Sequence, residues 1–236
     1  MKKLIPIAVV AVLAMGAAFF WGGTQTSPSS TNLSLPGAAV AQEASEDVDT
    51  SMVHEMVLGA EDAPVTMIEY ASSTCPHCKN FHLGSFKQLK SDYIDTGKVR
   101  FIYREVYFDR FGLWAAMVAR CGMPVDANAP EMETASKRYF AIMDMVFEQQ
   151  SEWLEGEGPA DIAENLAKFG RTAGLGAEQV DACLQDADFA RALIAVYEEN
   201  RAADGVQSTP TFIINGEKVT GNQPYAALSE LIEAGL

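Results

Sequence analysis

Hydrophobic residues along this chain alternate between the spacing of strands and the spacing of helices. Residues 64–71 form a mainly apolar run that predicts a buried strand, and residues 98–106, rich in β-branched and aromatic side chains, predict a second strand. Between them, residues 76 to about 91 carry apolar side chains at roughly helical spacing: Phe81, Phe86 and Leu89. The order strand, helix, strand implies that the two strands pair in parallel.

A long helical block separates this unit from the C-terminal strands. From about residue 111 to 200, apolar residues recur at helical spacing in several successive stretches. Residues 211–215 and 217–220 then predict a β-hairpin around Asn215-Gly216, and a final helix follows at about 224–234. The strands before and after the block can share one sheet only if the block is inserted into the domain, which predicts an α/β fold.

The N-terminus has the pattern of an export signal. Lys2 and Lys3 precede an apolar run of 18 residues, which ends at Trp21. Residues 1–21 are therefore a signal peptide or, because 18 residues approach the length that spans a bilayer, an uncleaved membrane anchor. Residues 22–52 are rich in small and polar side chains and predict a flexible leader to a domain at 53–236.

The net charge argues against a nucleic-acid partner. Asp and Glu number 32 and Lys and Arg 17, which gives a formal charge of −15 at pH 7. A surface of this sign repels a phosphate backbone. The acidity is better explained as a feature that keeps the protein soluble.

Two cysteines lie one helical turn apart at the junction of the first strand and helix. The motif reads Cys75-Pro76-His77-Cys78, and Pro76 suits the first helical turn because its missing N–H would have no partner there. Cys75 then faces the free amides and positive dipole end of the helix, a setting that lowers a thiol pKa to about 3.5–7.5. The predicted chemistry is thiol-disulfide exchange.

The same four residues are also compatible with less reactive roles. His77 either adds charge or a hydrogen bond to the Cys75 sulfur, or is an exposed histidine with little effect on it. The pair itself could form a structural disulfide or half of a zinc site. A four-cysteine zinc site needs a second closely spaced pair, whereas Cys121 and Cys183 are 62 residues apart.

The dithiol motif, together with Thr209-Pro210 before a late strand, resembles the DsbA family of periplasmic oxidoreductases. The resemblance covers residues from about 53 to 236. It implies a thioredoxin fold with a helical insertion at about 111–200, and a redox-active disulfide between Cys75 and Cys78. It also implies unfolded exported proteins as substrates, a DsbB-like membrane oxidase as partner, and no metal or organic cofactor.

The same resemblance assigns roles to three more residues. Thr209 and Pro210 map onto the cis-proline loop that binds an extended substrate beside the dithiol, although a proline there could by itself mark only the start of a strand. Glu69 lies six residues before Cys75 in an apolar strand. The resemblance implies a buried acid that assists proton transfer to Cys78, and the alternative is a surface-facing Glu69 paired with Lys or Arg.

We expect less reactive roles for the remaining cysteines and histidines. In an exported protein Cys121 and Cys183 predict a second, structural disulfide. The alternatives are two buried free cysteines or a pair that passes electrons to the dithiol. His54 and His82 have no companion ligands in the sequence, so we expect ordinary surface or satisfied side chains.

The sequence as a whole predicts an exported, periplasmic dithiol oxidase, with tethering to the inner membrane left open. A reductase or isomerase of the same fold is the nearest alternative, although no dimerisation module is evident. A non-catalytic module that binds a metal or a peptide is the alternative of another class.

Overall fold

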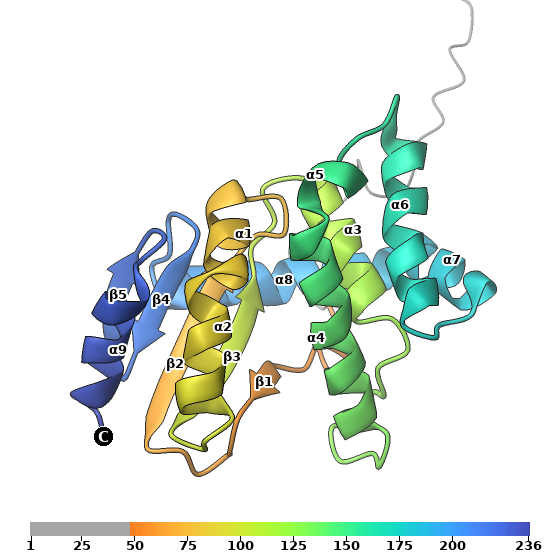
Figure 1. The fold of residues 1–236 in the computed structure, drawn as a ribbon. Coiled ribbons are helices and arrows are strands. Elements are labelled where there is room, and N and C mark those ends of the chain that lie inside the picture. Colours follow the sequence, from red (N-terminus) through yellow and green to blue (C-terminus); the bar gives the residue numbers. More distant parts are fainter. Residues whose placement is uncertain (1–47) are drawn as a thin grey trace, which may run out of the picture. The chain divides into compact units, whose positions relative to one another are not determined.

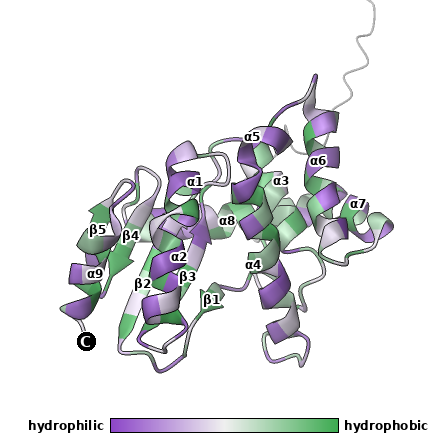
Figure 2. Ribbon diagram, in the orientation of Figure 1, coloured by the Kyte–Doolittle hydropathy of each residue, from purple (hydrophilic) through white to green (hydrophobic). Residues whose placement is uncertain are grey.

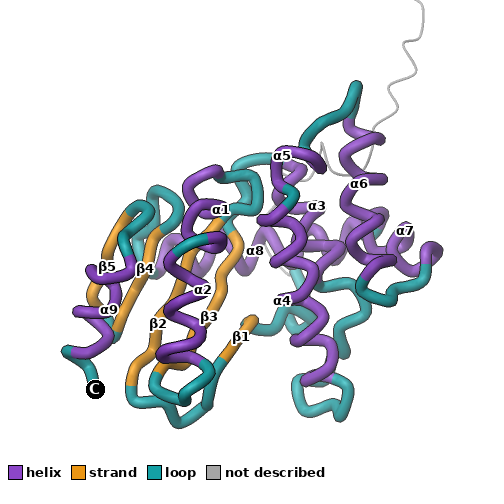
Figure 3. The backbone as a smooth tube through the Cα atoms, viewed as in Figure 1, coloured by secondary structure: helices purple, strands orange, loops and turns teal. Residues whose placement is uncertain are grey.

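A five-stranded sheet lies at the centre of residues 48–236, the part of the chain that the computed structural model describes (Figures 1 and 3). Its strand order is β1 (Met56–Leu58), β3 (Val99–Glu105), β2 (Val65–Ala71), β4 (Thr211–Ile214) and β5 (Glu217–Thr220). Strands β2 and β3 are parallel, as predicted, and the other neighbours are antiparallel. The predicted signal or anchor and most of the predicted leader lie outside the described residues.

The helices confirm the prediction of an α/β fold with an inserted helical block. Helices α1 (Pro76–Leu83) and α2 (Ser85–Leu89) and the π-helical turn η3 (Lys90–Ile94) connect β2 to β3, and α9 (Tyr225–Glu233) follows the hairpin. The block itself comprises α3 (Arg110–Ala119), α4 (Met132–Glu148), α5 (Gln150–Trp153), α6 (Pro159–Thr172), α7 (Ala177–Gln185) and α8 (Ala187–Ala203). Within residues 48–236 no helix has the length and apolar character needed to cross a bilayer.

Alternating side chains of β2 pack into two different layers. Met67 and Ala71 belong to the main core with Phe81 of α1, whereas Tyr70 belongs to a small cluster that includes Tyr197 of α8. Figure 1 shows α1 and α2 in front of the sheet and α8 behind it. Because strand side chains alternate, Glu69 faces the same layer as Met67 and Ala71, towards α1.

Helix α3 is the buried centre of the inserted block. Its residues from Gly112 to Ala119 are all buried, and Figure 2 shows mainly hydrophobic colours along it. The Asp109 side chain caps its N-terminus by accepting hydrogen bonds from the amides of Phe111 and Gly112. The helix therefore begins at a fixed point just after β3, close to the end of the sheet that carries the dithiol.

Two local features differ from the sequence prediction. The helix expected over residues 76–91 is interrupted at Gly84, where an added Cβ would lie 3.0 Å from the Asn80 carbonyl oxygen. The three-residue strand β1 was not predicted, because so short a segment shows no clear alternation. The predicted turn is present, with positive φ angles of 46° at Asn215 and 89° at Gly216.

Candidate active site

Cys75 occupies the N-cap position of α1, directly after the loop that leaves β2. Its φ and ψ angles are −82° and 122°, and Pro76 follows at the start of the helix. Cys78 lies on the first turn and is fully buried, while Cys75 is 9% exposed. Neither sulfur is bonded, so the site is in its dithiol form and only Cys75 is accessible to a reactant.

The surroundings of Cys75 favour its thiolate. Hydrogen bonding by the Cys78 thiol is the largest effect, and the backbone amides of Cys78 and His77 add to it. Together they outweigh the cost of burial and lower the pKa of Cys75 to about 5. A large fraction of the Cys75 side chains is therefore ionised and nucleophilic at neutral pH.

The surroundings of Cys78 favour the opposite state. Burial raises the pKa of Cys78 strongly, and the hydrogen bond to Cys75 and the negative charge of Glu69 raise it further. Cys78 thus stays protonated and donates its hydrogen to the Cys75 sulfur. The two thiols have separate tasks, a reactive one at the surface and a protonated one beneath it.

A loop from the far end of the chain meets the dithiol. The Thr209–Pro210 peptide bond is cis, and the Cys75 Sγ lies 3.7 Å from the Thr209 carbonyl oxygen, to which it can donate when it is protonated. Pairing of Tyr70 with Thr211 in adjacent strands fixes this approach. The loop thereby places backbone hydrogen-bonding groups next to Cys75.

His77 contributes differently from Cys75 and Cys78. Its side chain is exposed, and its backbone amide is the group that helps to stabilise the Cys75 thiolate. No hydrogen bond of its imidazole to the Cys75 sulfur is found among the described residues. A direct effect of the side chain on the thiol remains a prediction.

Glu69 lies in the buried layer beneath α1, so the alternative of a surface-facing carboxylate is wrong. It is 0% exposed, and its Oε2 is 3.0 Å from the Nε2 of His82. The contact lacks the alignment of a good hydrogen bond, and no other partner for either Glu69 oxygen is found within residues 48–236. The partner of Glu69 is therefore a histidine rather than the Lys or Arg considered from the sequence.

His82 is the residue of this site that the sequence interpretation undervalued. It is 7% exposed, and its ring stacks on Phe147 of α4 with centroids 4.1 Å apart. The available signal was its position four residues after Cys78, which places both side chains on one face of α1. His54, in contrast, contacts the carbonyl oxygen of Pro124 at 2.9 Å, away from the dithiol.

Two residues of the helical block hold the loop that precedes Cys75, and neither was predicted. The buried Gln150 donates from Nε2 to the carbonyl oxygens of Ser73 and Cys75, at 2.7 and 3.1 Å. Thr74 donates to Asp109 at 2.8 Å, so the capping residue of α3 holds the same loop. Such contacts between distant segments leave no periodic signal in a sequence.

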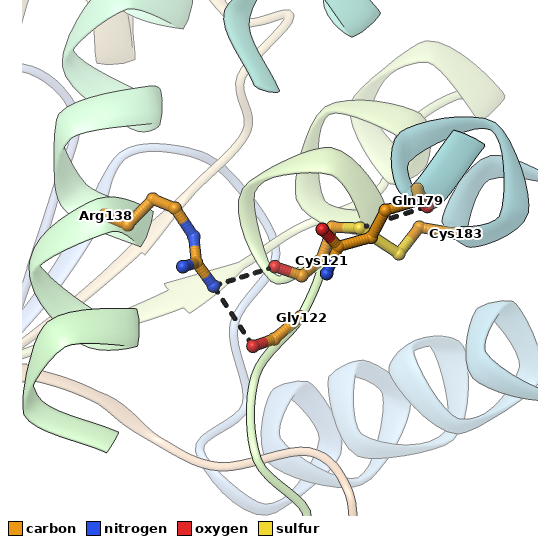
Figure 4. Close-up of a disulfide and its surroundings, with 5 residues drawn as sticks. All are labelled: Cys121, Gly122, Arg138, Gln179 and Cys183. Carbon is orange, nitrogen blue, oxygen red and sulfur yellow. Dashed lines mark hydrogen bonds between the residues drawn. A yellow bond between two sulfur atoms is a disulfide. The ribbon is translucent and has the colours of Figure 1, made fainter. Parts of the chain in front are cut away.

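The other two cysteines form a disulfide, Cys121–Cys183, which joins the end of α3 to α7 (Figure 4). Arg138 of α4 donates to the carbonyl oxygens of Cys121 and Gly122, at 3.0 and 3.1 Å. The bond therefore lies at a meeting point of three helices of the block. Neither of these cysteines is a free thiol in this structure, in contrast to the alternative of two buried free cysteines.

A buried dithiol at a helix N-terminus beside a cis-proline loop defines the class of thiol-disulfide exchange proteins built on a thioredoxin-like sheet. A family model described as thioredoxin matches residues 51–234. The chain therefore belongs to the thioredoxin family, and its relatives place it among the DsbA-like members.

Two curated relatives illustrate this placement. A protein of Rickettsia bellii, provisionally named protein-disulfide oxidoreductase, is 31% identical over 183 residues, which are 76% of this chain and 65% of the relative. Disulfide bond formation protein D of Bacillus subtilis is 27% identical over 190 residues, which are 79% of this chain and 79% of the relative. The matched region spans 60% to 65% of the length of the Rickettsia relatives.

Solved structures agree with the fold. The crystal structure of the T172V variant of α-DsbA1 from Wolbachia pipientis has a TM-score of 0.66 and 26% identity, covering 77% of this chain and 90% of the other. Oxidised BdbD of Bacillus subtilis has a TM-score of 0.63 at 23% identity, covering 77% and 92%. The thioredoxin fold with an inserted helical domain, expected from the resemblance, is confirmed.

Proposed function

We propose that this protein is a thiol-disulfide oxidoreductase that introduces disulfide bonds into exported proteins. The observation that carries the proposal is the pairing of a Cys75 thiol of low pKa with a protonated, buried Cys78. Stabilising the thiolate stabilises the reduced form of the protein. A disulfide whose reduced form is stabilised is a strong oxidant.

In the proposed reaction the oxidised protein accepts electrons from a pair of substrate thiols. A substrate thiolate attacks Cys75, which forms a mixed disulfide and releases Cys78 as a thiolate that takes up a proton. A second substrate thiolate then attacks the substrate sulfur of the mixed disulfide and releases Cys75 as its stabilised thiolate. The products are a substrate disulfide and the dithiol, and no metal or organic cofactor takes part.

Thr209 and Pro210 are proposed to bind the substrate. Their loop lies against the Cys75 sulfur, so an extended polypeptide could hydrogen-bond to the Thr209 backbone while its cysteine reaches Cys75. The exposed His77 is proposed to lie at the edge of this contact. Glu69 is proposed to exchange a proton with Cys78, because its charge acts on the Cys78 thiol from within the buried layer.

The location and the partner of the protein are further parts of the proposal. The name of the Bacillus subtilis relative supports the oxidising direction. Because an export signal is predicted at residues 1–21, the proposed location is the periplasm, either free or tethered to the inner membrane. A membrane oxidase of the DsbB type is proposed to restore the Cys75–Cys78 disulfide.

The alternative functions are a zinc site and a reductase or isomerase of the same fold. A zinc site of four thiolates is disfavoured because Cys121 and Cys183 are bonded to each other and cannot join the dithiol. A reductase or isomerase would use the same site at a lower potential. The low pKa of Cys75 favours the oxidase over these.

An equilibrium titration in glutathione buffers tests the direction of electron flow. The fraction of protein with free Cys75 and Cys78 is measured by alkylation and mass spectrometry as the glutathione ratio is varied. We expect a midpoint near the oxidising extreme of the family, about −120 mV, rather than the −270 mV typical of thioredoxin. A midpoint in the reducing range would contradict the oxidase proposal and favour a reductase.

A further inference from the structure

We infer that His82 is a positioning residue that acts through Glu69 to control protonation of Cys78. The inference rests on the proposed function and adds to it a residue for the step in which Cys78 gains or loses its proton. It is based on the position of His82 within a closed layer of the fold. Cys78, Glu69 and His82 are treated as a series, because the Glu69 charge acts on the Cys78 thiol and Glu69 contacts His82.

The burial of these groups defines a direction for the proton. Cys78 and Glu69 are both 0% exposed, so neither exchanges protons directly with bulk water. His82 is 7% exposed and lies 3.0 Å from Glu69, which makes it the member of the series that reaches the solvent. A proton bound for Cys78 therefore has a route from solvent through the imidazole and then the carboxylate.

The buried Glu69 carboxylate favours a partner that can carry a positive charge. A buried carboxylate is costly unless a charge or hydrogen bonds compensate it, and no Lys or Arg contacts Glu69 among the described residues. An imidazolium at His82 would compensate the charge and could also release its proton. A permanently charged Lys or Arg would do only the first.

The ring of His82 is held in place by aromatic neighbours. It stacks on Phe147, with an interplanar angle of 10°, and its centroid is 4.7 Å from that of Phe86 and 5.7 Å from that of Tyr103. These contacts hold Nε2 close to the Glu69 carboxylate, at 3.0 Å. A residue that serves only for packing would make the same aromatic contacts, so the experiment must separate packing from the proton role.

Protons and electrons balance in each direction of the exchange. When a substrate thiolate attacks Cys75, the electron pair of the broken S–S bond goes to the Cys78 sulfur. The His82 imidazolium transfers a proton to the Glu69 carboxylate, Glu69 passes it to that sulfur, and the imidazole is reprotonated by solvent. In the reverse direction, when Cys78 attacks a mixed disulfide at Cys75, its proton leaves by the same groups.

Several titratable groups face His82 and must be considered in the pH dependence. They are Glu69 from β2, Tyr103 from β3, Cys78 from α1 itself and Asp144 from α4. Burial raises the pKa of Tyr103 far above its ordinary value, and burial raises that of Asp144, which the His82 charge opposes. Asp144 is exposed, whereas Cys78 is fully buried.

The test is the rate at which glutathione reduces the Cys75–Cys78 disulfide between about pH 5 and pH 9, corrected for the glutathione thiolate concentration. Wild-type protein is compared with His82→Gln, Glu69→Gln, the double variant and the control His54→Gln. We expect His82→Gln to be about tenfold slower and to lose a pH inflection that the control retains, at the low end of the usual effect of a proton-transfer group. The double variant should be no slower than Glu69→Gln.

A second substitution separates proton transfer from packing. His82→Phe keeps an aromatic ring on Phe147 but cannot carry a proton, so it should be as slow as His82→Gln; it also serves if His82→Gln does not fold. The inference would be overturned if His82→Phe had the wild-type rate and pH profile. It would also be overturned if the double variant were slowed by the product of the effects of His82→Gln and Glu69→Gln. A wild-type protein without any exchange activity would instead refute the proposed function.

Discussion

Cys75 and Cys78 have the same side chain, three residues apart, and the fold gives them opposite acidities. Cys75 gathers hydrogen bonds at the open end of a helix, which lowers its pKa to about 5, and Cys78 is enclosed among apolar groups beside the charge of Glu69, which raises its pKa. This difference in pKa arises because the two residues lie one helical turn apart, one at the surface and one buried. The difference determines which sulfur a substrate attacks.

The low pKa of Cys75 predicts that the stability of the reduced protein depends on pH. An ordinary thiol titrates near 8.5, so the depressed folded pKa adds stability that is complete above about pH 8.5 and is lost as the pH falls through about 5. At about pH 7 the contribution is roughly 3 kcal/mol, and at about pH 4 it is absent. The free energy of unfolding of the reduced protein, measured by urea denaturation at both pH values, checks this.

The oxidised protein is the matched control for this measurement. It contains every titratable group except the Cys75 and Cys78 thiols. Cys78 stays protonated in the folded protein between about pH 4 and pH 7, so over this range the difference between the two forms isolates the Cys75 thiolate. We expect the reduced form to lose its advantage over the oxidised form on acidification. Parallel pH curves for the two forms would show that Cys75 has an ordinary pKa.

The sequence predicted the reactive residues of this site better than their supporting contacts. The spacing of Cys75 and Cys78 and the proline between them are local features, so they could be interpreted without a structure. His82 and Gln150 reach the site from one turn further along the helix and from a distant helix. Their roles depend on tertiary contacts. The spacing of His82 from Cys78 indicates a shared helix face, but no pattern in the sequence marks Gln150.

At the scale of elements, the loop from Ser73 to Cys75 lies between two helices of the inserted block. Gln150, at the start of α5, binds its backbone, and Asp109, at the start of α3, binds the Thr74 side chain. The loop is thus held from outside the strand and helix that it connects. The inserted block therefore helps to fix the N-terminus of α1, on which the acidity of Cys75 depends.

Removal of the Gln150 amide should loosen this loop. In Gln150→Ala the carbonyl oxygens of Ser73 and Cys75 lose a donor, at an expected cost of about 1–3 kcal/mol in unfolding free energy. The hydrogen bonds to the Cys75 sulfur should weaken as the loop moves, and the Cys75 pKa should rise by about one unit, equivalent to about 1.4 kcal/mol. The pH dependence of thiolate absorbance measures the shift.

The neighbouring Gln149→Ala provides the comparison, since the Gln149 side chain makes no hydrogen bond to the loop in the described part of the chain. It should leave the Cys75 pKa unchanged. If both variants lose stability and neither shifts the pKa, the Gln150 contact supports the fold but does not influence the thiol.

At this scale the prediction from sequence succeeded where an element had its own pattern. The parallel pair β2 and β3, the Asn215-Gly216 hairpin and the succession of helices all follow from hydrophobic spacing and turn residues. The prediction failed at β1, which is too short to show a pattern. It also failed at Gly84, where the helix is interrupted and an added Cβ would lie 3.0 Å from the Asn80 carbonyl oxygen.

At the scale of the whole described domain, the inserted block has its own covalent link. The disulfide Cys121–Cys183 closes a loop of 62 residues that contains most of the block. None of the influences on the Cys75 or Cys78 pKa comes from this bond. We therefore expect the second disulfide to support the framework and to take no part in the exchange reaction.

Removal of both cysteines should separate stability from reactivity. In the chain-entropy model, a Cys121→Ala and Cys183→Ala double variant loses roughly 4 kcal/mol of unfolding free energy. Thermal and urea unfolding measure the loss, and the Cys75 pKa should be unchanged. During turnover of the wild-type protein, alkylation should label Cys75 and Cys78 alone; labelling of Cys121 or Cys183 would instead indicate that the second pair passes electrons.

The strand order of the sheet has a consequence for a chain that is still being made. Cys75 and Cys78 emerge early, but Thr209 and β4, which pairs with the central strand, come 134 residues later. As long as the chain is unfolded, Cys75 and Cys78 are ordinary thiols that are largely protonated at neutral pH. We therefore expect an unfinished or truncated chain to exchange disulfides more slowly than the finished protein, because the reactive Cys75 thiolate depends on the completed fold.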